Sequence, residues 1–330
     1  MKRIATLTLA VSLLAPNLLA ATIDGAWTAS IDEKRPDRMY FSITRGRSHQ
    51  SGNTMRIASF ANLTEAQIKA TTMTPVRFEM RREAGTAVFE GTFRNGKGAG
   101  QFDFTPNRAY IAAVEALGVK FDLDRKHRRD RDRSEDEDLF ALALHDVSTT
   151  FIKTMINEGY KVPLEEYLSM RIFDVTPEYI REMRALGFKD ITSDELVSSR
   201  IHGVTPDYVR EMRAAGWNVP LDDLQSSRIH GATPEFAAEM KKLGYGKLSL
   251  DELVSFRIHG VSAQFINELR TLGYANVDAD DLVSMRIHRV TPEFIRELEA
   301  AGYTKVPVEK MISMRIHGVD AKFIKTMSKK

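Results

Sequence analysis

The chain has 330 residues, of which 43% are apolar and 28% are charged, with no cysteine and a formal net charge of +2. This length is enough for two domains of ordinary size, and the apolar fraction excludes a wholly disordered chain. Without cysteine the chain can form no disulfide scaffold, no thiolate zinc site and no cysteine nucleophile.

The N-terminus has the pattern of a secretory signal. Lys2 and Arg3 precede an apolar run over residues 4–15, and small residues follow shortly after it. A run of this length is typical of a signal peptide and falls short of the ~20 residues of a membrane span. We therefore expect a signal peptide over residues 1–21, an exported bacterial protein that is periplasmic or secreted, and no membrane span in the mature chain.

Cleavage also changes the charge balance. The chain has 47 basic and 45 acidic residues, and the signal removes two bases and no acid, which leaves 45 of each. A neutral, exported chain has no general attraction to a phosphate backbone. We therefore expect no nucleic acid among its partners.

Residues 22–104 are predicted to form a small antiparallel β domain. Apolar residues alternate with polar ones over residues 76–80 and again over residues 87–93, which is the period of a strand. Asn95-Gly96 lies between such runs and is typical of a type I′ hairpin turn. Further strands are expected over residues 26–31, 39–44 and around 102–104, and a short helix over 63–70. The last strand should lead directly into Thr105.

Residues 105–330 are built from a repeat of 28–29 residues, about seven copies in all. One arginine of the recurring Arg-Ile-His-Gly-Val phrase marks each clear copy, at spacings of 29, 28, 29, 29 and 29. The marker arginines are Arg171, Arg200, Arg228, Arg257, Arg286 and Arg315. An earlier copy is expected to begin at Thr105-Pro106, interrupted by a charged, exposed loop insertion over residues 120–134.

Each copy predicts two short helices. In one copy, Thr205 and Pro206 are suited to the N-cap and the first turn of a helix, and Gly216 is suited to end it. Ser249 and Glu252 form the capping-box pattern that begins a second helix. Helices this short are marginal in isolation, so neighbouring copies must cover their apolar sides. The predicted fold class is α+β: an N-terminal antiparallel β domain followed by an α-solenoid.

Arginine and histidine recur at fixed places in the array and are its candidate site residues. The histidines are His202, His230, His259, His288 and His317. One interpretation is a binding stripe for carboxylates or phosphates. The interpretation that we favour is structural: each arginine pairs with a glutamate of a first helix (Glu182, Glu211, Glu239, Glu268 or Glu297), and each histidine caps the last carbonyls of its helix.

No pattern in the sequence predicts catalysis, a metal or a cofactor. Equivalent histidines in stacked helices stand about 8–10 Å apart, too far to share one ion at a bond length of ~2.0–2.1 Å. No histidine is followed by glutamate, which excludes the His-Glu-x-x-His zinc helix. Ser48 and His49 are neighbours on an expected turn rather than a nucleophile and its base. We therefore predict that the chain is not an enzyme.

The phrase Arg-Ile-His-Arg-Val-Thr-Pro-Glu-Phe-Ile-Arg-Glu-Leu, residues 286–298, resembles repeats of bacterial exported proteins of unknown role. It is also similar to the tail of some antirepressor-type membrane metallopeptidases related to beta-lactam sensors. The peptidase's zinc motif and membrane helices have no counterpart in this sequence, so the resemblance does not imply proteolysis.

Three functions remain open from the sequence. The first is a non-enzymatic scaffold for protein–protein interaction in the cell envelope, because stacked repeats offer an extended surface to a protein partner. The second, implied by the resemblance alone, is a sensor or accessory subunit of an envelope peptidase or antirepressor signalling system. The third is binding of a small ligand in the β domain, in a pocket lined by Trp27, Phe41, Phe78 and Phe89.

Overall fold

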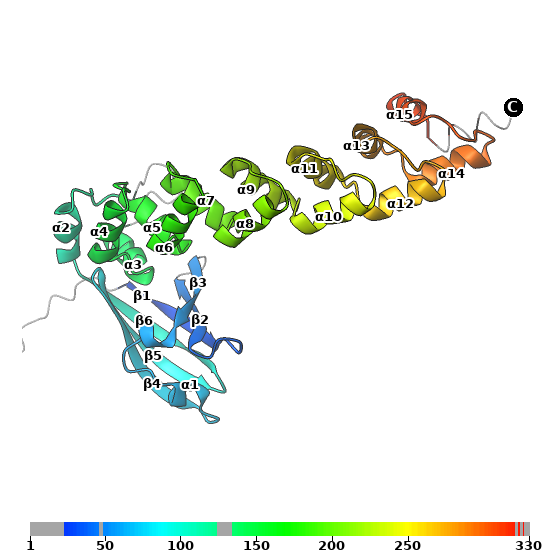
Figure 1. Ribbon diagram of the computed structural model, residues 1–330. Coiled ribbons are helices and arrows are strands. Elements are labelled where there is room, and N and C mark those ends of the chain that lie inside the picture. The colour runs from blue at the N-terminus through cyan, green and yellow to red at the C-terminus, as the bar shows by residue number, and fades with distance from the viewer. Residues whose placement is uncertain (1–22, 46–48, 124–133, 321–322, 324–325, 327–330) are drawn as a thin grey trace, which may run out of the picture. The chain divides into compact units, whose positions relative to one another are not determined.

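The computed structural model describes residues 23–45, 49–123, 134–320, 323 and 326. The expected signal peptide, Ser48 and most of the expected charged loop lie outside these residues. An antiparallel sheet precedes a long run of paired helices, which confirms the predicted α+β fold class (Figure 1). The chain divides into two compact units, the first ending at Ile172 and the second beginning at Phe173.

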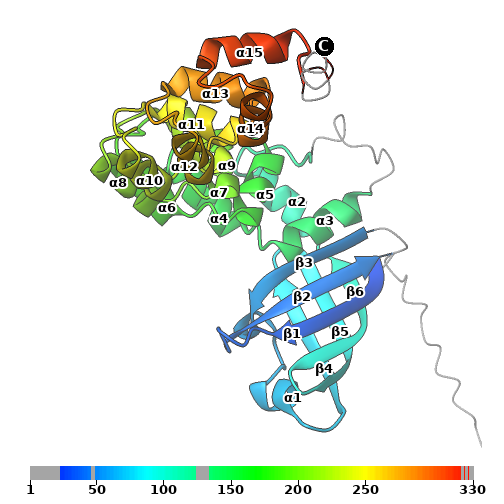
Figure 2. The ribbon, with the colours of Figure 1, turned by 90° about the vertical axis from the view of Figure 1, so that its right-hand side faces the viewer.

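The first unit contains a six-stranded sheet in which every neighbouring pair is antiparallel. Its strands are Ile23–Ile31 (β1), Arg38–Arg45 (β2), His49–Arg56 (β3), Thr74–Arg82 (β4), Gly85–Arg94 (β5) and Lys97–Pro106 (β6). Their order across the sheet is β3-β2-β1-β6-β5-β4 (Figure 2). A 3₁₀ turn, Ile57–Ser59 (η1), and the short helix Glu65–Lys69 (α1) connect β3 to β4. The expected hairpin turn is confirmed, because Asn95 and Gly96 both have positive φ angles, 50° and 76°.

The core of the sheet is a cluster of aromatic rings around Trp27, which is 1% exposed. The Trp27 ring lies 5.7 Å from that of Phe41 and 5.2 Å from that of Phe78, centroid to centroid. Gly91 makes room for it, since a Cβ at Gly91 would stand 2.8 Å from Trp27 Cζ2. Trp27 Nε1 donates to the carbonyl of Glu90 at 3.2 Å, so the indole is both packed and hydrogen bonded.

Two details of the sheet differ from the sequence prediction. Strand β3 was not predicted, because its residues are mostly polar and lack alternation; it pairs with β2 alone at the sheet edge. The first repeat was expected to begin at Thr105-Pro106, but its first helix begins at Ala109. Thr105 and Pro106 belong to β6, where Thr105 lies opposite Thr86 and Pro106 opposite Gly85.

Four helices complete the first unit. They are Ala109–Glu115 (α2), Glu135–Leu144 (α3), Thr149–Asn157 (α4) and Leu164–Ile172 (α5). Helix α3 packs on β1, β5 and β6, with the Phe140 ring 5.4 Å from that of Phe102 and 5.0 Å from that of Phe104. The first repeats are therefore packed directly on the sheet, and the unit boundary falls inside the array.

The second unit consists of helix pairs arranged in two rows (Figure 1). The first helices are Pro177–Ala185 (α6), Pro206–Ala214 (α8), Pro234–Lys242 (α10), Ala263–Thr271 (α12) and Pro292–Ala300 (α14). The second helices are Ser193–His202 (α7), Leu221–His230 (α9), Leu250–His259 (α11), Ala279–Ile287 (α13) and Val308–Ile316 (α15). Each second helix contacts the second helix of the next pair, as a solenoid requires.

Local signals set the helix ends as predicted. Thr205 Oγ1 accepts from the backbone N–H of Tyr208 at 3.2 Å, with Pro206 in the first turn. Ser249 and Glu252 form a reciprocal capping box at the start of α11. Gly203, Gly231 and Gly260 end three second helices at φ of 71° to 72°, the left-handed conformation in which glycine costs least.

Candidate interaction surface of the repeats

Every marker arginine lies over an aromatic ring of its own helix pair. The distances from guanidinium carbon to ring centroid are 4.9 Å for Arg171–Phe151, 5.1 Å for Arg200–Tyr179, 4.4 Å for Arg228–Tyr208, 4.7 Å for Arg257–Phe236, 5.0 Å for Arg286–Phe265 and 5.1 Å for Arg315–Phe294. These are cation–π distances. The rings stand 20 or 21 residues before their arginines, a periodicity that would have revealed the pairing in the sequence.

The same arginines donate to carbonyls at the end of the preceding second helix. The Nε atoms reach His145 O, Phe173 O, Gly203 O, His230 O, His259 O and His288 O at 3.0 to 3.4 Å. The last carbonyls of a helix have no partner within it, and they carry its negative dipole end. Where the preceding helix belongs to the same unit, each arginine therefore joins three helices: its own, the partner that carries the ring, and the preceding one.

The expected pairing of these arginines with first-helix glutamates is wrong. Glu182, Glu211 and Glu239 are exposed, and the marker arginines point to carbonyls instead. Two arginines do meet a carboxylate, but it comes from the turn after the preceding helix: Asp146 for Arg171 at 3.1 Å and Asp174 for Arg200 at 2.9 Å. Backbone carbonyls leave no mark in the sequence, which is why the true partners were missed.

The two aspartates occupy the position that glycine takes in four of the other repeats, at Gly203, Gly231, Gly260 and Gly318, and that Arg289 takes in one. Asp146 and Asp174 have positive φ angles of 54° and 55°. At Gly231 a Cβ would stand 2.9 Å from Nη2 of Arg257, so glycine at this position leaves room for the arginine side chain. The carboxylate that replaces glycine offsets its backbone strain by pairing with the same arginine.

The histidines lie on the solvent side of the second helices. His202, His230 and His317 are exposed, and His259 and His288 are half-buried. The capping role expected for them is seen at His317, whose ring Nδ1 lies 2.8 Å from the carbonyl of Ser313. In the parts of the chain that the structure describes, no group of three or more His, Asp or Glu side chains could hold a metal ion.

A row of exposed isoleucines runs beside the histidines, and it was not among the candidate site residues predicted from the sequence. The isoleucine after each marker arginine is about half exposed. The fractions are 40% for Ile172, 51% for Ile201, 53% for Ile229, 53% for Ile258, 49% for Ile287 and 56% for Ile316. We call the five in the second unit, from Ile201 to Ile316, the isoleucine row.

The outer face of each second helix has the same order of residues. In α11, Asp251, Ser255 and Ile258 are four and three residues apart, which places them along one side of the helix. The buried side carries Leu253 at 1% exposure and Phe256 at 1%. From its N-terminal to its C-terminal end, the outer face of each second helix therefore carries an exposed acid, then a serine, then the isoleucine and the histidine.

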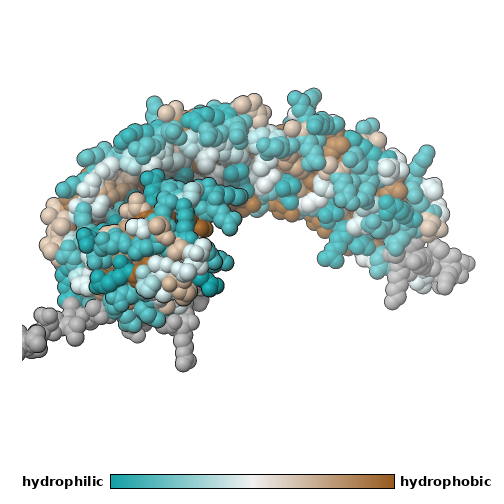
Figure 3. Space-filling model, turned by 90° about the horizontal axis from the view of Figure 1, so that it is seen from below, coloured by the Kyte–Doolittle hydropathy of each residue, from teal (hydrophilic) through white to brown (hydrophobic). Residues whose placement is uncertain are grey.

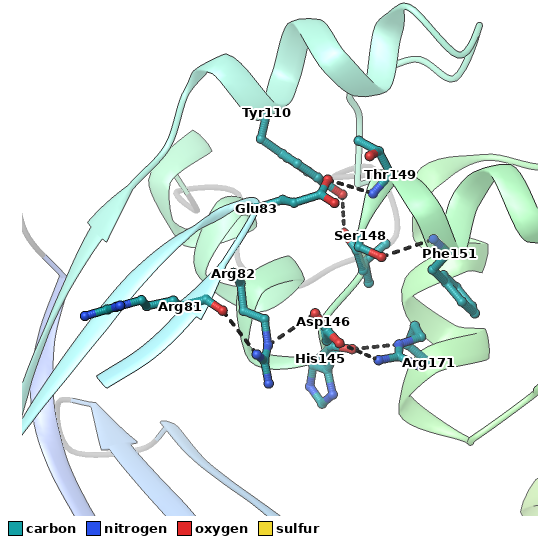
Figure 4. Close-up of polar contacts among 11 residues, drawn as sticks. Arg81, Arg82, Glu83, Tyr110, His145, Asp146, Ser148, Thr149, Phe151 and Arg171 are labelled. Atoms are coloured by element: carbon teal, nitrogen blue, oxygen red, sulfur yellow. Dashed lines mark hydrogen bonds and ion pairs between the residues drawn. The ribbon is translucent and has the colours of Figure 1, made fainter. Parts of the chain in front are cut away.

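The first unit has a polar cluster where the β4–β5 turn meets α3 and α4 (Figure 4). Asp146 lies between Arg82, at 3.2 Å, and Arg171, at 3.1 Å. Glu83 accepts from the backbone N–H of Thr149 at 2.9 Å, at the N-terminus of α4. Arg82 Nε is buried and makes this ion pair without a hydrogen bond. The ion pairs and the bond from Thr149 together fasten the sheet to the first repeats.

Burial shifts the pKa values of two further residues in this cluster. Tyr110 donates its hydroxyl to the carbonyl of Val147, and burial raises its pKa, helped by the negative charges of Glu83 and Asp146. Burial lowers the pKa of His145, and the positive charge of Arg171 lowers it further. Both groups are therefore held in their neutral forms.

The four aromatic residues expected to line a ligand pocket are part of the packed core. Trp27, Phe41, Phe78 and Phe89 are between 0% and 2% exposed. The rings of Phe78 and Phe89 stack at 5.0 Å, and those of Phe41 and Phe89 meet edge to face at 5.1 Å. A ligand between them would have to displace these ring contacts.

No known protein family, curated protein or solved structure matches the chain. Among the described residues, no single helix is long and apolar enough to cross a membrane. Helices α3 and α4 reach that length and composition only together, with a bend of 71° between them.

Proposed function

We propose that the chain is a non-enzymatic, exported scaffold that binds another protein through the outer face of its second helices. The observation that carries this proposal is a contrast within the repeats. The exposed isoleucine is the same residue in every clear copy, whereas the residue two positions before it is serine in two copies, phenylalanine in one and methionine in three, and it is buried in all but Met314.

This contrast is the reverse of what folding alone produces. A buried residue is constrained by the volume around it, and a half-exposed one is not. Large apolar side chains repeated on a surface are typical of an interaction site. The marker arginines need no partner to explain them, because rings and carbonyls already hold them.

Export is supported by the basic and apolar pattern of residues 1–21, which lie outside the described residues. Cell fractionation and N-terminal sequencing test it. We expect a mature chain in the periplasm or medium that begins at Ala21 or Thr22. A cytoplasmic chain that begins at Met1 would contradict export.

Site-specific photocrosslinking in intact cells tests the interaction surface. A photoreactive residue at Ile258 is compared with one at Ala238, which is exposed on the first helix α10. We expect discrete crosslinked polypeptides from Ile258 and none from Ala238. Equal crosslinking from both positions, or none from either, would contradict the proposal.

A further inference from the structure

The isoleucine row is regular enough to indicate the form of its partner. Its five members lie at equivalent positions of α7, α9, α11, α13 and α15, and neighbouring second helices are in contact. Helices in contact have axes about 8–10 Å apart, so successive isoleucines recur at about that distance. A partner that touches them all must present apolar side chains at the same interval.

The distance between successive side chains on one face differs among the regular conformations of a polypeptide. A polyproline II helix has three residues per turn and rises ~3.1 Å per residue, so every third side chain recurs at about 9.3 Å. Side chains on one face of a β-strand recur at about 6.6–6.8 Å, which loses register after one or two repeats. Heptad positions of an α-helix recur at about 10.5 Å, beyond the upper end of the helix spacing.

Serines on the same face suit a partner whose backbone is not paired internally. A serine lies three residues before each isoleucine: Ser198, Ser226, Ser255, Ser284 and Ser313. The hydroxyl of Ser198 already donates to Oε1 of Gln225 at 3.1 Å, so the four serines from Ser226 to Ser313 are the ones considered as donors to a partner. A polyproline II segment has no internal hydrogen bonds, so its carbonyls remain free to accept from hydroxyl groups. The small serine side chain also lets a backbone approach the helix closely.

The charge along the N-terminal margin of the row favours a basic partner. The marker arginines that directly precede the isoleucines are already engaged with rings and helix-end carbonyls. Five exposed acids lie seven residues before the isoleucines, two helical turns toward the N-termini: Asp194, Asp222, Asp251, Asp280 and Glu309. Beside them, burial raises the pKa of Asp281, and the charges of Asp278, Glu309 and Asp280 raise it further. Negative charge is thus concentrated along one margin of the isoleucine row. A cation placed there would relieve this repulsion.

We propose, resting on the proposed function, that the outer face of the second helices binds a basic polypeptide segment in the polyproline II conformation. The side chains of this segment form three rows, and each row faces a different part of the surface. An apolar side chain at every third position lies against the isoleucine row, and Lys or Arg follows the acidic margin. The remaining row, in which proline fixes the conformation, faces solvent.

Fluorescence anisotropy with a labelled (Pro-Leu-Lys)5 peptide and the mature protein tests the proposal. The triple variant Ile229→Ser, Ile258→Ser, Ile287→Ser should raise the dissociation constant at least about tenfold, since three lost apolar contacts exceed the ~1.4 kcal/mol of a tenfold change. The variant Asp222→Asn, Asp251→Asn, Asp280→Asn should weaken binding severalfold at low salt and less at high salt. The matched control Glu211→Gln, Glu239→Gln alters acids of the first helices and should leave binding unchanged.

Two further peptides test the conformation and the charge. (Pro-Leu-Glu)5 should bind at least tenfold more weakly than the lysine peptide. A basic helical peptide with leucine at every seventh position should not compete with it. Failure of (Pro-Leu-Lys)5 to bind, or binding that ignores the isoleucine substitutions, would overturn the inference. If crosslinks from Ile258 formed in cells but only the helical peptide bound, the polyproline II inference would be overturned and the proposed scaffold function would stand.

Discussion

The sheet and the repeats of the second unit reach stability in different ways. The sheet gathers residues from distant parts of the chain around Trp27, which contacts rings from β2, β4 and β5. The repeats instead use the same three-helix contact many times, an arginine on a ring and on a carbonyl 25 to 27 residues earlier. A lost contact should therefore affect the whole sheet but only the neighbouring repeats of the array.

In the repeats, the residues that stabilise the fold and the residues that face solvent lie on different sides of each helix. Residues of the sheet core are constrained by one another, and few of them face solvent. In the space-filling view, hydrophilic residues predominate on the visible face, with apolar residues between them (Figure 3). The array satisfies its folding requirements with residues on the buried side of each helix, which leaves the outer side of the second helices free to carry a repeated pattern for another purpose.

The largest effect on stability is expected from Trp27→Ala. Removal of the ring leaves a cavity among Phe41, Phe78 and Phe93, and large-to-small changes of this kind cost about 3–5 kcal/mol. Calorimetry should show a strongly lowered unfolding temperature for the first unit. Hydrogen exchange in α9 to α13 should not change. Faster exchange there would contradict the claim that the second unit is stable without the core of the first.

The next largest effect is expected from Arg257→Ala, at about 1–2 kcal/mol, from a lost cation–π contact and a lost bond to a helix-end carbonyl. Urea unfolding measures this cost, and hydrogen exchange should locate it in α9, α10 and α11. Arg210→Ala is the matched control, because its exposed pair with Asp207 is worth little. Equal costs for the two variants would contradict the role assigned to the marker arginines.

A smaller effect is expected at Asp174, which has a positive φ angle and pairs with Arg200. Asp174→Ala keeps the backbone strain and loses the pair, so it should destabilise by about 1 kcal/mol. Asp174→Gly loses the pair but removes the strain, and its free energy of unfolding should stay within about 0.5 kcal/mol of the parent. If glycine cost as much as alanine, the backbone at this turn would not be the source of strain.

The pH dependence of stability should include a contribution from His145. Its pKa is lowered in the folded chain from 6.5, so the unfolded chain binds the proton more tightly. Stability of the first unit should therefore fall as the pH drops below about 6.5, and His145→Gln should reduce that fall. An unchanged pH profile in this variant would show that His145 is protonated equally in both states.

Much of the array could be predicted from the sequence because its signals are local. Thr205, Pro206 and Gly216 act on residues within one or two turns, so the helix ends follow from the printed order of residues. Strand β3 and the ends of β6 depend on a partner strand, and the sequence pattern did not contain that information.

The candidate site was predicted less well than the fold. The sequence marked Arg257 and His259 by their periodicity, but the carbonyl partner of Arg257 carries no residue type to recognise. Ile258 and its equivalents are part of every marker phrase, but the sequence pattern assigned them neither burial nor exposure. The exposure of Ile258 depends on which side of α11 meets the next helix, and this is settled by packing between repeats.

The smallest effect on stability per substituted site and the largest effect on binding are expected from the same variant, so measuring both tests the central claim most directly. For Ile229→Ser, Ile258→Ser, Ile287→Ser, the free energy of unfolding should change by no more than about 0.5 kcal/mol per site. Crosslinking from a photoreactive residue at Ile201 should be lost. A strongly destabilised variant that still forms those crosslinks would show that the isoleucine row serves the fold and not a partner.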